Sequence, residues 1–155
     1  MTMKKKIRGR LKKKRGPVVS KKVTHDGIKF ASGLEKYMYI ALKKAKLKAK
    51  YEGETYIVQD GFEFKTTSYE RQSNGKGEFK DRGNKKILAI KYTPDFVSDS
   101  FIIECKGRAN ESFPLRWKMF KKYVKVNLPH VTIYKPQNQK ECDKVIELIT
   151  KSKKK

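Results

Sequence analysis

Positive charge is concentrated at the two ends of this chain, and this limits where a core can form. Residues 1–22 contain eleven Lys or Arg and no acid, and residues 151–155 add four lysines to a formal net charge of +24. Blocks of like charge repel one another and stay extended until they meet a polyanion. We therefore predict a single folded domain over residues 23–150, between a flexible basic arm and a short basic tail.

The composition of the chain excludes several classes of protein. Its 155 residues are 37% hydrophobic and 11% aromatic, which is enough for one globular core. The longest hydrophobic run covers only residues 37–42, too short for a membrane-spanning helix or the apolar region of a signal peptide. Cys105 and Cys142 lie far apart without a CxxC spacing, so neither a disulfide framework nor a cysteine zinc site is indicated. We expect a reducing cytoplasm and no membrane partner.

Hydrophobic periodicity predicts an α/β (α+β) fold. Apolar residues at helical spacing follow Ser32, whereas a polar, turn-rich stretch over 59–86 indicates a loop or hairpin insertion. In chain order we predict a helix over 32–48, strands over 51–58, 61–64, 87–97 and 101–106, a helix over 112–126, a strand over 131–134 and a helix over 138–150. This order favours a mixed β-sheet flanked by helices.

The strongest hairpin signal joins the strands over 87–97 and 101–106. Pro94-Asp95-Phe96 ends the first strand, and Glu104-Cys105-Lys106 follows nine residues after Asp95. Period-two alternation places Glu104 and Lys106 on one face of the second strand. We expect the opposite face, with Phe101, Ile103 and Cys105, to point into the core. A tight turn would then bring Asp95 beside Glu104, so that two carboxylates and an ammonium converge.

Carboxylates beside a polyanion indicate an intervening cation. Two acids that point at a phosphodiester are electrostatically unfavourable on their own, and hard oxygen ligands suit Mg²⁺, which retains waters and bridges to phosphate. Asp95 and Glu104 are therefore candidate metal ligands, and Lys106 could hold the attacking water or the developing oxyanion. Spacing alone leaves open a plain salt bridge among the same three residues.

The E-x-K triplet is not specific in a chain so rich in lysine. It also occurs at Glu63-Phe64-Lys65 and at Glu78-Phe79-Lys80. The triplet at 78 lies in a glycine-rich polar stretch, and the triplet at 63 has no strand that ends in Pro-Asp at a suitable distance upstream. Only Glu104-Cys105-Lys106 has the surroundings that such a site needs.

Three strings of this sequence resemble the motifs of the PD-(D/E)XK nuclease superfamily, and in particular its Holliday-junction resolvases of the phage endonuclease I type. They are Ser32-Gly33-Leu34-Glu35, Tyr92-Thr93-Pro94-Asp95-Phe96 and Glu104-Cys105-Lys106-Gly107, and the resemblance covers roughly residues 28–135. It implies an αβββαβ core, dependence on Mg²⁺ or Mn²⁺, and products with a 5′-phosphate. It also implies that Glu35 joins the metal site, and the Cys105 carbonyl is a candidate further ligand.

Glu35 has an alternative role. Ser32-x-x-Glu35 is also a capping box, in which the glutamate returns to the start of its own helix. Spacing favours capping, whereas the family resemblance favours metal binding. Residues 59–86 look like an insertion relative to the compact resolvases, and the dimer-forming elements of those enzymes do not map onto this chain.

Basic residues in two places are candidate contacts to DNA phosphates. The first group belongs to the N-terminal basic arm, for which a solubility or localisation role is the alternative. The second lies on or before the helix after Gly107, and a solvated helix face is its alternative. The candidates are Lys12, Lys13, Lys14, Arg15, Arg108, Arg116, Lys118 and Lys121.

The sequence therefore predicts a metal-dependent DNA endonuclease of phage or mobile-element type. We expect it to be structure-selective and resolvase-like, with Mg²⁺ as cofactor, branched DNA as partner and a homodimer as one option. The alternatives are a non-catalytic basic nucleic-acid-binding protein, and a structural factor that keeps the nuclease fold without activity. The intact set of Asp95, Glu104 and Lys106 speaks against the last of these.

Overall fold

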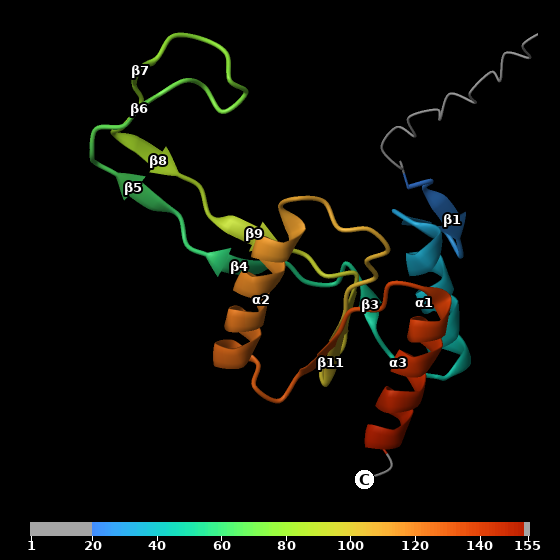
Figure 1. Ribbon diagram of the computed structural model, residues 1–155. Coiled ribbons are helices and arrows are strands. Elements are labelled where there is room, and N and C mark those ends of the chain that lie inside the picture. The colour runs from blue at the N-terminus through green and yellow to red at the C-terminus, as the bar shows by residue number, and fades with distance from the viewer. Residues whose placement is uncertain (1–19, 154–155) are drawn as a thin grey trace, which may run out of the picture.

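A computed structural model describes residues 20–153 of the chain (Figure 1). A central four-stranded sheet has the strand order β12-β11-β10-β3. Strand β10 pairs antiparallel with β3 and β11, whereas β11 pairs parallel with β12, so the sheet is mixed. The predicted α+β class is therefore confirmed. The elements are β3 (Lys50–Tyr51), β10 (Phe96–Val97), β11 (Phe101–Ile103) and β12 (Thr132–Tyr134), with α1 (Gly33–Lys44), α2 (Phe113–Asn127) and α3 (Gln139–Ser152).

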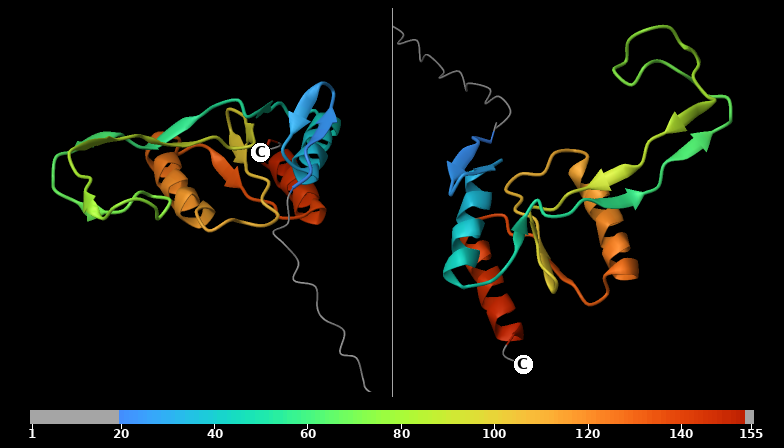
Figure 2. Two further views of the ribbon diagram at one scale, coloured as in Figure 1. Left: turned by 90° about the horizontal axis from the view of Figure 1, so that it is seen from above. Right: turned by 180° about the vertical axis from the view of Figure 1, so that it is seen from behind.

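Helices cover both faces of this sheet. Figure 2 shows α1 and α3 together on one side of β11, and α2 on the other. As expected, Phe101, Ile103 and Cys105 belong to the core under α1 and α3. Ile102 is equally buried, in a second core under α2 that includes Trp117. The sheet face that carries Glu104 is thus a core face too, which alternation alone did not predict.

Helix α1 begins where the sequence predicts and ends four residues earlier. The Ser32 hydroxyl accepts a hydrogen bond from the Glu35 N–H at 3.2 Å, as an N-cap does. At the other end Lys46 has a left-handed φ of 54°, and the Leu47 N–H donates to the Leu42 carbonyl at 3.0 Å. This is a Schellman motif, which satisfies the last carbonyls and stops the helix.

The caps of the other two helices differ from one another. Asn138 caps α3 by accepting from the Glu141 N–H at 3.0 Å, at the start predicted for this helix. Ser112, where the helix over 112–126 was predicted to start, does not cap α2, because its side chain makes no capping hydrogen bond. Asn110 replaces it: its Oδ1 accepts from the Phe113 N–H at 2.9 Å.

An N-terminal hairpin precedes α1, and the predicted elements did not include it. Strands β1 (Val23–His25) and β2 (Ile28–Phe30) pair antiparallel. Asp26 and Gly27, with φ values of 48° and 74°, form the two-residue turn between them. Asp-Gly is a strong signal for this turn type, so the sequence did contain the information. The hairpin places Phe30, which is fully buried, under α1.

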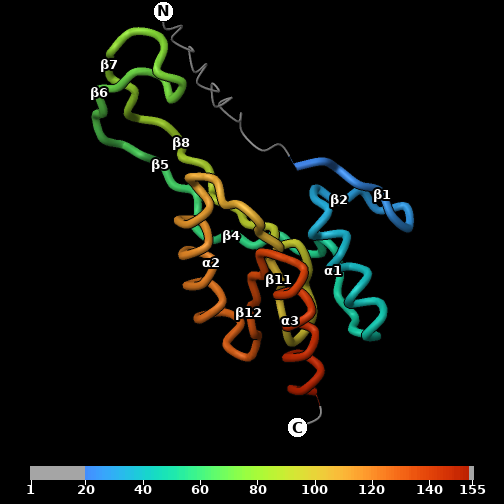
Figure 3. Tube along the Cα trace, turned by 45° about the vertical axis from the view of Figure 1, so that its right-hand side comes forward, coloured from blue at the N-terminus to red at the C-terminus, as the bar shows by residue number. Residues whose placement is uncertain are grey.

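Residues 56–92 form a long antiparallel hairpin, here called the extended hairpin, which projects away from the body (Figures 1 and 3). The predicted insertion over 59–86 is thus a hairpin rather than an open loop. Its strands pair in the order β4 with β9, β5 with β8 and β6 with β7. They are β4 (Tyr56–Gln59), β5 (Phe62–Phe64), β6 (Tyr69–Glu70), β7 (Lys80–Asp81), β8 (Lys85–Ile87) and β9 (Ile90–Tyr92).

The single strand predicted over 87–97 is wrong. The chain leaves β9 at Tyr92, passes through Thr93-Pro94-Asp95, and enters the central sheet as β10. Pro94 has no N–H to donate to a ladder, so the break falls where proline interrupts pairing. Asp95 therefore lies where the extended hairpin joins the body.

In residues 20–153, none of the helices is long and apolar enough to cross a membrane.

Replacing Asn110 should destabilise the protein more than replacing Ser112. We expect Asn110→Ala to lower the free energy of unfolding by about 1 kcal/mol, because the first turn of α2 loses its acceptor. Ser112→Ala is the matched control and should cost much less. Urea unfolding measures both, and the reverse ranking would show that Ser112 is the cap after all.

Candidate active site

The register of the β10–β11 hairpin brings two carboxylates together. Phe96 pairs with Ile103, so Asp95, just before β10, lies opposite Glu104, just after β11. Asp95 Oδ2 accepts a hydrogen bond from the Cys105 N–H at 2.6 Å. The predicted convergence of Asp95 and Glu104 is therefore present, and a backbone hydrogen bond holds it.

The parallel strand β12 extends this support beyond the sheet. The Glu104 N–H donates to the Tyr134 carbonyl at 2.9 Å, and the Lys106 N–H donates to the Pro136 carbonyl at 3.0 Å. Because the intervening Cys105 N–H bonds Asp95, all three amides of the E-x-K triplet have a fixed partner. Glu104 and Lys106 are thus presented from rigid backbone.

Burial makes the negative charge of these acids costly. Glu104 is only 5% exposed, and Asp95 is half-buried. Burial is the largest cause that raises the pKa of Asp95, to about 8, and the charges of Glu104 and Glu35 add to it. Burial also raises the pKa of Glu104, against the opposing effect of Lys106. Two carboxylates that share a confined, poorly solvated space favour a cation or a proton between them.

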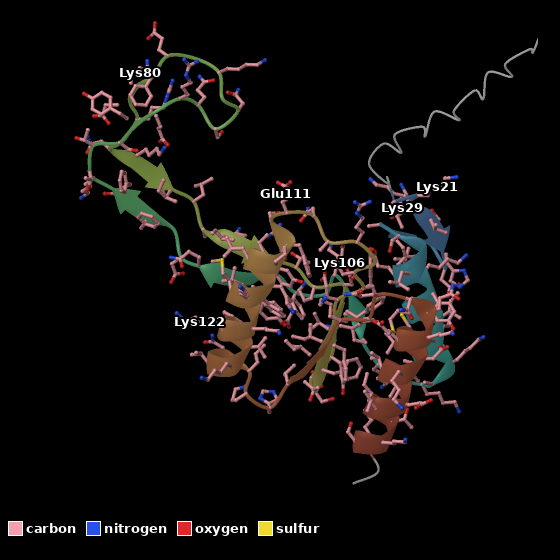
Figure 4. The ribbon with its side chains drawn as sticks, in the orientation of Figure 1. Lys21, Lys29, Lys80, Lys106, Glu111 and Lys122 are labelled. Carbon is pink, nitrogen blue, oxygen red and sulfur yellow. The ribbon has the colours of Figure 1, made fainter. Side chains whose placement is uncertain are left out.

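Lys106 lies next to the acids. Its Nζ is 3.4 Å from Glu104 Oε1 and 4.7 Å from the centroid of the Phe113 ring. Figure 4 shows Lys106 near the centre of the body, beside α2. Lys135, which the sequence did not single out, lies 6.0 Å from the same ring. The structure therefore brings Asp95, Glu104 and Lys106 together, and a second ammonium lies close by.

Glu35 is buried near these residues, but its oxygens are already engaged. Its Oε1 accepts from the Ser32 hydroxyl at 2.7 Å, and its Oε2 accepts from the Ala31 N–H at 3.0 Å and the Tyr51 hydroxyl at 2.6 Å. Glu35 thus returns to the start of its own helix, as the capping alternative predicted, but it accepts from the Ala31 N–H instead of the Ser32 N–H, and Tyr51 of β3 is an added donor. Glu35 nevertheless lies close enough to Asp95 for its charge to raise the pKa of that carboxyl.

The possible metal ligands near Asp95 are few: two carboxylates, and not the larger set of side chains that encloses a metal ion completely. No group of three or more His, Cys, Asp or Glu side chains in residues 20–153 is arranged to hold a metal ion. Mg²⁺ is commonly bound through one or two carboxylates, with waters and substrate phosphates completing its octahedron. Asp95 and Glu104 fit that pattern. The side chain of Cys105 interacts with the thiol of Cys142 in the core, so only its backbone can contribute to the site.

Tyr92 is a member of this site that the sequence analysis missed. Its ring stacks on Phe120 with centroids 4.5 Å apart, and its buried hydroxyl has no hydrogen-bond partner within the described part of the chain. Burial is the largest cause that raises the pKa of Tyr92, and the negative charge of Glu104 adds to it. An unpaired buried hydroxyl normally requires a water, ion or ligand. The signal in the sequence that could have indicated Tyr92 is its position three residues before Asp95, in the string Tyr92-Thr93-Pro94-Asp95.

The predicted basic contacts do not all lie near the carboxylates. Arg116 is close: its Nη2 donates to the Lys91 carbonyl at 2.8 Å, beside Tyr92. Arg108 is exposed in the loop between β11 and α2. Lys118 and Lys121 are exposed on α2, and Lys118 lies opposite the face that packs on the core. Lys12, Lys13, Lys14 and Arg15 lie outside the described residues.

The raised pKa of Asp95 predicts how stability depends on pH. Between the ordinary value of 3.8 and about 8, the folded protein binds more protons at Asp95 than the unfolded chain does. Without metal, stability should therefore fall as the pH rises through this window. Asp95→Asn removes the cost of ionising this carboxyl in the folded protein. It should therefore raise the melting temperature at pH 8 by several degrees, but not at pH 4.

Thermal unfolding in a chelator measures this effect. Asp99→Asn is the matched control, because Asp99 is exposed in the turn of the same hairpin. A melting temperature of the Asp95 variant that stays at or below the wild-type value at pH 8 would show that Asp95 is not under electrostatic strain.

Comparisons with known proteins add a family but no function. A protein-family model described as "Protein of unknown function (DUF1064)" matches residues 15–139. No curated protein matches the chain, and no solved structure does.

Proposed function

The chain belongs to the DUF1064 family, and we propose from the geometry of its own residues that it is a metal-dependent DNA endonuclease. The observation that carries this proposal is the pair of half-buried Asp95 and buried Glu104, side by side at the end of one hairpin with Lys106 against Glu104. In a chain of net charge +24, such a concentration of buried acid is chemically useful if it attracts a cation.

Asp95 and Glu104 are the residues that would hold the metal. Ionised oxygens suit Mg²⁺, and Mn²⁺ should substitute because it accepts the same ligands. When bound, the metal would lower the pKa of a coordinated water and stabilise charge on the scissile phosphate. Glu35 would join the site by giving up part of its capping box, and the Cys105 carbonyl is a further candidate ligand.

Lys106 would act on the nucleophile or on the developing oxyanion. Its ammonium is held between Glu104 and the face of the Phe113 ring, and its side chain is 31% exposed. It can therefore reach a phosphate or water at the mouth of the site while it remains positioned by Glu104. Tyr92, with its unpaired hydroxyl, could orient a water in the same space.

The substrate is proposed to be branched DNA in a host cytoplasm or nucleoid. The basic ends supply sequence-tolerant affinity for the DNA backbone, and the resemblance to resolvases of phage or mobile elements suggests junctions and a homodimer. A non-catalytic nucleic-acid-binding protein is the second candidate. The ion pair of Lys106 with Glu104, at 3.4 Å, favours that reading, because it balances the buried charge without metal.

Cleavage of a plasmid and of a four-way junction in the presence of Mg²⁺ tests the proposal. The wild-type protein should cut, and Asp95→Asn, Glu104→Gln and Lys106→Ala should each lower the rate by at least about a hundredfold. Mn²⁺ should restore activity after chelation, and Ca²⁺ should not.

The second E-x-K triplet provides the matched control. Glu63 and Lys65 form an exposed ion pair at 3.2 Å in the extended hairpin, so Glu63→Gln and Lys65→Ala change the same residue types away from the site. Both should cut at the wild-type rate. Metal-independent binding without cut products, or cleavage that survives Asp95→Asn, would support the second candidate instead.

The N-terminal lysines should govern the salt dependence of binding. Replacing Lys12, Lys13, Lys14 and Arg15 with alanine should reduce the slope of log K against log[salt] by up to about 0.9 per lost phosphate contact. Duplex affinity measured over a series of salt concentrations gives this slope. An unchanged slope would assign these residues to solubility or localisation.

A further inference from the structure

The tip of the extended hairpin, here residues 66–84, carries two exposed aromatic rings that lie together. Tyr69 is 64% exposed and Phe79 is 67% exposed. Their ring centroids are 6.1 Å apart and the planes are inclined by 38°. Exposing large apolar side chains to water is unfavourable. A pair of them at the end of a projecting element therefore indicates a binding site for a ligand.

The backbone of the tip is held in a defined shape. The Arg82 N–H donates to the Ser68 carbonyl at 2.7 Å, and the Arg82 guanidinium donates to the carbonyls of Glu70 and Glu78 at 3.2 and 3.3 Å. Gly83 lies so close to Thr66 that a side chain there would meet its carbonyl oxygen. The two rings are thus presented on a framework that is already ordered, which lowers the entropic cost of binding.

The charge around the rings is arranged to favour an anionic ligand. Lys85 Nζ pairs with Glu70 at 2.7 Å, and the backbone amides of Ser68 and Gly83 donate to Asp81, which lowers its pKa. By contrast, no carboxylate of the described residues lies within salt-bridge distance of Lys76 or Lys80. Figure 4 shows Lys80 at the tip, far along the extended hairpin from Lys106. Glu70 and Asp81 are thus satisfied internally, and among the described residues of the tip the free ammonium groups of Lys76 and Lys80 outnumber the one unpaired carboxylate, Glu78.

We propose that the tip binds unpaired nucleotides of single-stranded DNA, with bases stacked on Tyr69 and Phe79 and phosphates near Lys76 and Lys80. Aromatic rings need an accessible base face, and in a duplex both faces are covered by neighbouring base pairs. The pair therefore recognises unstacked bases, and the lysines add affinity for the backbone. A second copy of the chain fits less well, because it would bring an extended hairpin of the same positive sign.

This inference rests on the proposed function for the choice of DNA, and it adds the feature of DNA that is recognised. Strand β9 leads from the extended hairpin directly into Pro94 and Asp95. A strand held at the tip is therefore tethered to the element that carries the first carboxylate. The arrangement suits a nuclease that selects DNA with unpaired bases next to the cut.

Binding of a single-stranded oligonucleotide containing 2-aminopurine, in EDTA and with the full chain, tests the proposal. The wild-type protein should change the fluorescence of the probe, which reports base stacking. Tyr69→Leu and Phe79→Leu should each weaken single-strand binding about tenfold and leave duplex affinity within twofold. Tyr69→Phe keeps the ring and should bind as the wild type does. Leu88→Ala is the matched control, because it removes another exposed apolar side chain of the extended hairpin.

Three results would overturn the proposal. The first is an equal loss of affinity for single-stranded and duplex DNA in the leucine variants. The second is no loss of single-strand affinity in either Tyr69→Leu or Phe79→Leu. The third is a protein dimer that dissociates when the rings are removed. The last would assign the tip to contact between copies of this chain. Because EDTA prevents cleavage, this binding assay does not depend on catalysis. Base stacking by a protein that does not cut DNA would refute only the proposed nuclease activity. Cleavage by a protein that does not stack bases would refute only the proposed role of the tip.

Discussion

The pairing of Phe96 with Ile103 is the constraint on which the candidate site depends. It sets Asp95 opposite Glu104, and the Cys105 N–H closes the contact at 2.6 Å. A one-residue slip of this register would send every side chain of β11 to the other face and separate the acids. Since both faces of β11 are buried, such a slip would move Phe101 and Ile103 into the core under α2 and Ile102 into the core under α1 and α3, and this disruption of both cores makes the register strongly specified.

The two cores support a site that is electrostatically unfavourable by itself. Burial raises the pKa of both Asp95 and Glu104, and Lys106 compensates only part of their charge. Hydrogen bonds that the backbone of Glu104 and Lys106 donates to the carbonyls of Tyr134 and Pro136, and the packing of α2, nevertheless hold these groups in place. Strain of this kind is characteristic of functional sites, and it is consistent with the metal-binding role that we propose.

Sequence reasoning succeeded where the determinants are local. Ser32 with Glu35 and Asn138 with Glu141 lie within one helical turn, so these N-caps depend on local spacing alone. The break at Pro94 also had a local signal, because proline interrupts pairing, but the burial of Ile102 did not, because what covers the second face of a strand depends on distant elements. Tyr92 was missed for the same reason, since its unpaired hydroxyl becomes visible only when α2 covers it.

The most direct measurement of the central claim is a crystal structure with Mn²⁺ and a bound DNA fragment, read from its anomalous signal. The account predicts an anomalous peak between the carboxylates of Asp95 and Glu104, with Lys106 released from Glu104 toward a phosphate or water. A map without a peak there, in which Lys106 remains paired with Glu104 beside bound DNA, would contradict it.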